Sequence, residues 1–88
     1  MKQHYVKIAK RLAAKRRELE VLQQERDLAA LHRFVVDLKT CLPERLSYEN
    51  SPLLLEGLRI NQPDAMPDYV ERLRNGLDRW VEEYKQRV

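Results

Sequence analysis

The pattern of apolar and polar positions predicts helices along most of the chain. Between Lys2 and Leu42 there is neither proline nor glycine, and residues with high helix propensity dominate. Pro43 pushes the residue before it out of the α region, so the helix is expected to end at Leu42. The apolar residues recur at helical spacing and do not alternate. The sequence therefore predicts one long N-terminal helix over residues 2–42.

The apolar residues of this helix form two stripes on different faces. The first stripe contains Tyr5, Ile8, Leu12, Leu19 and, at its edge, Leu22. Five polar residues follow over 23–27, and the second stripe contains Leu28, Leu31, Val35, Leu38 and Leu42. At about 100° per residue, the second stripe is rotated by roughly 120° from the first. Either the helix bends over 23–27, or its halves face different partners, or a coiled-coil stutter shifts one seam, although a stutter shifts it by less.

The second half of the chain predicts a short helix and a long amphipathic one. Residues 43–50 are polar and irregular, and Ser51–Pro52 is typical of a helix start, with Ser51 as the cap of a short apolar helix over 51–58. Residues 61–67 carry two prolines and predict a loop, after which Pro67–Asp68 opens the last helix. Its apolar stripe contains Tyr69, Val70, Leu73, Leu77, Trp80, Val81, Tyr84 and Val88.

Two details of the last helix give further expectations. Asp68–Arg72 and Glu83–Arg87 have the spacing and order of i,i+4 ion pairs. Gly76 costs about 1 kcal/mol relative to alanine in a helix interior, so a neighbouring group is expected to approach it closely.

These elements predict an all-α fold in a single domain over residues 1–88. The long N-terminal helix packs antiparallel on the C-terminal helix, a short helix connects them, and the arrangement is partly coiled-coil. The stripe over 28–42 is expected to pack on the stripe over 69–84, which makes 28–88 the helical core. The basic half-helix over 1–27 is then expected to protrude from this core or to form a coiled coil.

Composition agrees with a small soluble helical protein, and the charge is unevenly distributed. No apolar run approaches the roughly 18 residues needed to span a bilayer, and the N-terminus lacks a signal-peptide core, so we expect a cytoplasmic protein with no membrane partner. The net charge of +3 hides seven basic and no acidic residues over 1–17. Residues 18–88 hold ten basic and all 14 acidic residues, a net charge of −4.

The sequence offers no arrangement that suggests catalysis. The two glycines form no phosphate-binding loop, and Cys41 is the single cysteine. His4 and His32 lie too far apart in sequence for metal-ligand spacing, and His32 is expected on a helix surface or boundary. We expect a protein that is not an enzyme, with no catalytic residue, no cofactor and no metal.

Two kinds of binding remain as hypotheses. The first stripe lacks an obvious internal mate, so it is predicted to bind another protein or a second copy of the chain. Trp80 is a residue type found in binding hot spots, but its place on the apolar stripe favours core packing. On the opposite side of the N-terminal helix lies a basic arc that would steer an acidic partner or contact nucleic-acid phosphates. This basic arc consists of Lys7, Lys10, Arg11, Lys15 and Arg17.

The chain also resembles the IraP-type anti-adaptors, small helical proteins of enteric bacteria. The likeness rests on Leu12-Ala13-x-Lys15, Glu18 and Leu22, then Glu56-Gly57, Pro63-Asp64-Ala65 and Pro67-Asp68, with a short insertion in the middle. The family is acidic where this chain has Arg16-Arg17. The resemblance implies a stress-response regulator that binds a response-regulator adaptor and so stabilises the stationary-phase sigma factor. The alternatives are a small dimeric nucleic-acid-binding protein and a structural subunit of a phage or secretion assembly.

Overall fold

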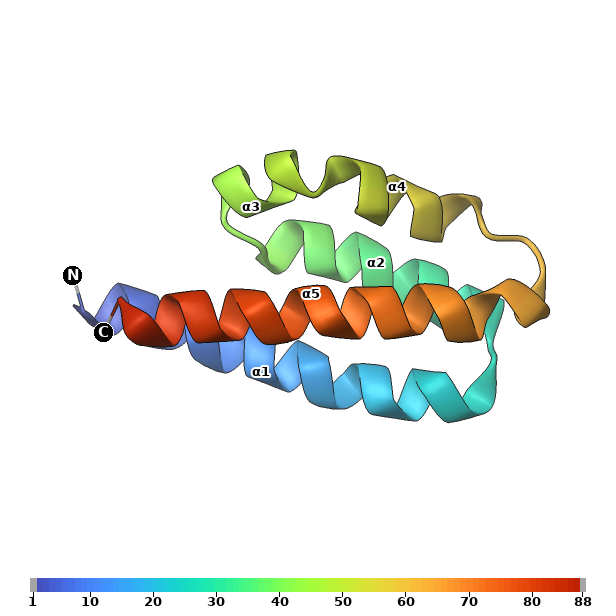
Figure 1. Cartoon of the computed structure of the whole chain (residues 1–88), viewed down its shortest axis with the longest axis horizontal. Helices are drawn as coiled ribbons and strands as arrows, with labels where there is room; N and C mark the ends of the chain where they lie inside the picture. Colours follow the sequence, from blue (N-terminus) through green and yellow to red (C-terminus); the bar gives the residue numbers. More distant parts are fainter. Residues whose placement is uncertain (1, 88) are drawn as a thin grey trace.

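A computed structural model describes residues 2–87, and over that range the chain forms an up-and-down arrangement of helices (Figure 1). The helices are α1 (Lys2–Glu25), α2 (Leu28–Cys41), α3 (Glu44–Glu49), α4 (Ser51–Arg59) and α5 (Met66–Gln86). A 3-10 turn over Pro63–Ala65 precedes α5. The all-α class is confirmed, as is the packing of α1 on α5, which run antiparallel so that the start of α1 and the end of α5 lie at the same end of the molecule.

The single helix predicted over 2–42 is instead two helices joined by a tight reversal. Arg26 has φ 53°, in the left-handed region, and its amide donates to the Leu22 carbonyl over 3.3 Å. Asp27 then caps α2, because its carboxylate accepts from the Ala30 amide over 3.1 Å. The polar run over 23–27 therefore marks a reversal of the chain, which is the extreme form of the predicted bend.

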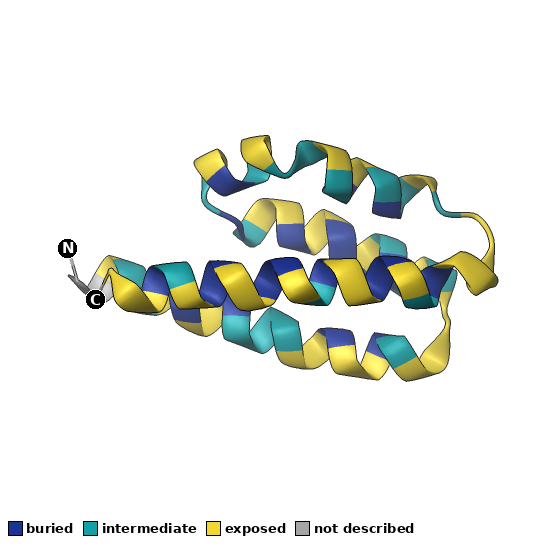
Figure 2. Ribbon diagram, viewed as in Figure 1, coloured by how far each residue is buried: buried dark blue, intermediate teal, exposed yellow. Residues whose placement is uncertain are grey.

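The first apolar stripe lies in the core, so of the two alternatives predicted for 1–27, a protruding half-helix or a coiled coil, the protruding one is wrong. Leu12 is 0% exposed and Leu19 1%, and Ile8 and Leu22 are also buried. Tyr5 is half-buried, with its ring centroid 5.8 Å from that of Tyr84. The physical reason is the reversal after α1: it turns α2 back beside α1, and the α1 stripe packs along α5 over its length (Figure 2).

The second stripe is buried as well, but its nearest neighbours differ from the prediction. Leu31, Val35 and Leu38 of α2 are fully buried. The α2 backbone lies closest to α4 and α1, whereas α5 lies closest to α1. Both stripes nevertheless join one hydrophobic cluster with the α5 stripe. The α5 stripe is confirmed from Tyr69 to Tyr84, and Val88 lies outside the described residues.

The connecting region contains more helix than predicted. The short helix is confirmed as α4, but Asn50 is its N-cap, without a side-chain bond, and Ser51 is its first residue. Residues 43–50, predicted to be irregular, contain α3, which begins directly after Pro43 and buries Leu46. Proline suits a helix start because the first amides need no intrahelical partner. The predicted loop contains the 3-10 turn, and α5 begins at Met66.

A buried tyrosine joins α4 to α5. Tyr69 is fully buried, and its Oη donates to the Leu53 carbonyl over 2.9 Å. Burial raises the pKa of Tyr69 above its usual value, so the hydroxyl remains a donor. Gly57 leaves room for this ring, because a Cβ there would lie 2.8 Å from Tyr69 Cε2. At Gly76 the expected close approach is confirmed: a Cβ would lie 3.2 Å from Trp80 Cζ2, on the same helix.

Ion pairs on the surface connect the elements. The predicted pairs are present, with 3.0 Å between Arg72 and Asp68 and 3.1 Å between Arg87 and Glu83. Arg16 also reaches Asp78 on α5 over 2.9 Å. Arg72 hydrogen-bonds Glu56 of α4 and so holds the pKa of that carboxyl below its usual value. Because these pairs are solvent-exposed, each contributes at most about 1 kcal/mol to stability.

Replacing Leu12 by aspartate tests whether α1 belongs to the core. The variant should lose more than about 3 kcal/mol of unfolding free energy in urea titrations followed by circular dichroism, because a charge would enter a fully buried site. Val21, 55% exposed on the same helix, provides the matched control. Val21→Asp should change stability by less than about 1 kcal/mol. Equal stability of both variants would contradict the core position of α1.

The two glycines should respond differently to alanine. Gly57→Ala should destabilise the fold by about 1–3 kcal/mol, because the methyl group would displace the buried Tyr69 ring. Gly76→Ala should destabilise the fold by at least about 1 kcal/mol less than Gly57→Ala does. The higher helix propensity of alanine offsets the milder contact of its methyl group with the Trp80 ring. Thermal or urea unfolding of both variants measures the difference, and the reverse order would show that Tyr69 is not held against Gly57.

Candidate interaction surfaces

The stripe predicted to bind a partner is not an accessible surface. Ile8, Leu12, Leu19 and Leu22 face the molecule's own core, and half-buried Tyr5 packs against it. The prediction assumed that this stripe had no internal mate, and α5 is that mate. Trp80, 4% exposed, likewise lies in the core. Of these stripe residues, Leu22 also borders a surface groove between α1 and α2.

Four residues of the predicted basic arc do face solvent. Lys7, Lys10, Arg11 and Arg17 are exposed, and none of them forms an ion pair with a carboxylate of residues 2–87. We call these four side chains the basic face of α1. All four are exposed residues of α1 that lie outside the buried stripe.

Lys15, the fifth residue of the predicted arc, lies elsewhere. Its Nζ is 3.1 Å from Glu18 Oε2 and 5.6 Å from the centroid of the Phe34 ring. Its side chain is only 16% exposed, because it folds over α2 and stays out of bulk solvent. This cation–π contact shields one side of Phe34 from water.

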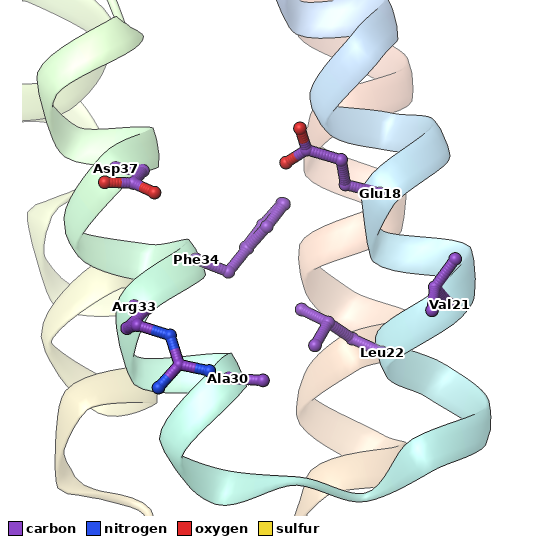
Figure 3. A pocket seen from close by; sticks show the side chains of 7 residues that line it. All are labelled: Glu18, Val21, Leu22, Ala30, Arg33, Phe34 and Asp37. Carbon is purple, nitrogen blue, oxygen red and sulfur yellow. The ribbon is translucent and has the colours of Figure 1, made fainter.

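A groove runs between α1 and α2 beside this lysine (Figure 3). Leu22 of α1 and Phe34 of α2 point toward one another across it, and Val21 lies on the outer side of α1. The groove has a volume of about 370 Å³. Its lining consists of Glu18, Val21, Leu22, Ala30, Arg33, Phe34 and Asp37. Four of these side chains are apolar, and the three charged ones carry both signs.

His32 and Cys41, two titratable residues considered in the sequence analysis, are both half-buried. His32 is half-buried, and its Nε2 donates to the carbonyl of Ile60, the C-cap of α4, over 2.9 Å. His32 lies inside α2, and its intermediate burial agrees with the predicted surface or boundary position. Cys41 is a half-buried free thiol in the last turn of α2. Within residues 2–87 no three His, Cys, Asp or Glu side chains are grouped to hold a metal ion.

Two further observations limit the kinds of site in the described part of the chain. No buried side-chain nitrogen or oxygen of residues 4–87 lacks a hydrogen-bond partner. Over the same residues, no helix has both the length and the apolar character needed to cross a membrane.

In comparisons with known proteins, no protein-family model, no curated protein and no solved structure matches the chain.

Proposed function

We propose that the chain is a non-enzymatic regulator that acts by binding another protein, and that the partner inserts an apolar side chain into the groove between α1 and α2. The observation that carries the proposal is this groove. The apolar stripes are packed internally, yet Ala30 remains half-buried and Val21 exposed along the groove. A pocket of this kind suits an anchoring side chain of leucine or phenylalanine size.

The charges around the groove support recognition of one orientation of the partner. Glu18 and Asp37 provide carboxylates, and Arg33 provides a guanidinium on the α2 side. Opposite charges on a partner would pair with them at the solvent-exposed rim, which contributes more to specificity and association rate than to affinity.

The resemblance to the IraP-type anti-adaptors supplies a partner class to test. It implies that the protein binds a response-regulator adaptor and blocks delivery of the stationary-phase sigma factor to its protease. No binding residue is transferred from that family to this chain. The proposed contact residues are those of the α1–α2 groove.

A single carboxylate placed in the groove tests the proposal. Ala30 is the third residue of α2, where glutamate suits a helix N-terminus capped by Asp27. Ala30→Glu should therefore keep the fold and lower affinity for the purified response-regulator adaptor by at least about tenfold, since a charge enters an apolar groove. Isothermal titration measures the affinity. Unchanged sigma-factor degradation with added protein would exclude the anti-adaptor role.

The adjacent alanine provides the matched control. Ala29 is exposed and does not line the groove, so Ala29→Glu adds the same charge at the same helix end. It should bind the adaptor as the unchanged protein does. Equal affinities of the Ala29 and Ala30 variants would remove the groove from the proposal, and no adaptor binding by the unchanged protein would remove this partner.

Nucleic-acid binding is the second candidate, because the basic face of α1 leaves four cations without carboxylate partners among the described residues. Replacing Lys7, Lys10 and Arg11 by glutamine should then reduce the slope of log affinity against log salt by about 2–3, at roughly 0.9 per phosphate contact. Fluorescence anisotropy with a DNA duplex over a salt series measures this slope. No DNA or RNA binding at low salt would exclude this function.

A further inference from the structure

A second groove lies on the other edge of α1, between α1 and α5. It has a volume of about 350 Å³ and is lined by Val6, Ala9, Lys10 and Ala13 of α1 and by Lys85 of α5. Ala13 projects roughly 180° from Leu22 around the helix axis, so this groove and the α1–α2 groove are distinct. The two alanines explain the hollow, because their side chains are too short to fill the space between the helices.

The lining of this groove is apolar except at its rims. Val6, Ala9 and Ala13 recur at intervals of three and four residues and so form one continuous apolar edge of α1. Lys10 and Lys85 approach the groove from the two different helices, and both side chains are exposed. Neither lysine forms an ion pair with a carboxylate of residues 2–87. The groove therefore combines an apolar floor with a cation on each side.

We propose that this groove binds an acidic amphipathic helix of a partner protein. The apolar ridge of that helix lies against Val6, Ala9 and Ala13, and carboxylates on its two flanks pair with Lys10 and Lys85. The apolar edge spans about 10 Å, which matches two turns of a bound helix. This site lies outside the α1–α2 groove, so a test of it is independent of the function proposed above.

The shape of the groove favours a helix over a lipid surface. A membrane-binding face presents protruding apolar side chains that enter the bilayer. Here the apolar floor is partly recessed: Ala9 is 7% exposed, Val6 and Ala13 are half-buried, and both lysines are exposed. A convex ridge reaches such a floor, whereas a flat surface does not. The charge also selects the occupant, because two unpaired ammonium groups attract carboxylates and repel a basic helix.

A designed peptide provides the direct test on the full chain. The probe is a labelled helical peptide of about 18 residues, with leucines at intervals of three and four and glutamates on both flanks. One control has the same composition in scrambled order, and a second replaces each glutamate with lysine. Fluorescence anisotropy should show binding of the first peptide, at least about tenfold weaker binding of both controls, and weaker binding at high salt.

Charge reversal then locates the site. The double variant Lys10→Glu/Lys85→Glu should bind the acidic peptide at least about tenfold more weakly. Lys39→Glu/Arg59→Glu changes the charge equally on α2 and α4, at exposed positions outside the groove, and should bind as the unchanged protein does. Ala13→Leu fills the floor without changing charge and should also weaken binding. Ala30→Glu, in the other groove, should leave the peptide affinity unchanged.

Several results would overturn the proposal. One such result is that the protein binds the acidic and the scrambled peptide with equal affinity. Another is that Lys10→Glu/Lys85→Glu and Lys39→Glu/Arg59→Glu lose equal affinity for the acidic peptide. Binding to phosphatidylglycerol vesicles without peptide binding would assign the groove to a lipid surface instead. Self-association in sedimentation that Lys10→Glu/Lys85→Glu abolishes would assign it to a second copy of the chain.

Discussion

The antiparallel packing of α1 on α5 is the interaction on which the rest of the structure depends. These are the two longest helices, and each contributes a full apolar stripe to one hydrophobic cluster. Leu12 and Leu19 of α1 and Leu73 and Leu77 of α5 are almost completely buried there. A chain of this size needs most of its apolar residues in one core to be stable. If α1 left α5, the stripe of α1 and the part of the α5 stripe that packs on it would be exposed.

This packing is made possible by a reversal that occupies only two residues. Arg26 adopts the left-handed conformation and Asp27 caps the next helix, so α2 returns beside α1. The sequence indicated the place, through the polar run over 23–27 and the rotation of the apolar stripe. It did not indicate the reversal itself, because no glycine or proline interrupts residues 2–42 and arginine rarely marks a left-handed turn. The aspartate before Leu28 was the available signal, since aspartate is a preferred N-cap.

Helices that several sequence signals indicate together were predicted well, whereas the surface grooves were not predicted. In α5, a proline in the first turn, i,i+4 ion pairs and an uninterrupted stripe all favour one helix, and the stripe from Tyr69 to Tyr84 is buried as expected. The grooves depend on how separate helices meet. Ala9 and Ala13 form a hollow only because α5 lies beside them, and Phe34 borders a groove only because α2 returns beside α1. The periodicity of a single helix carries no such information.

Because the apolar stripes are buried in the core, other side chains are available for recognition than those predicted. The residues predicted to bind a partner hold the fold together, and Lys15 covers Phe34 and does not join the basic face. What faces outward on α1 is a set of cations without carboxylate partners among residues 2–87, with a groove along each edge of the helix.

Native-state hydrogen exchange of the protein tests this account most directly. If α1 belongs to the core, amides from Leu12 to Leu22 should exchange with the same free energy of opening as amides from Leu73 to Val81, near the global value for unfolding. Exchange of the α1 amides at the rates of an unfolded peptide, with α5 still protected, would contradict it, because α1 would then separate from a core that survives without it.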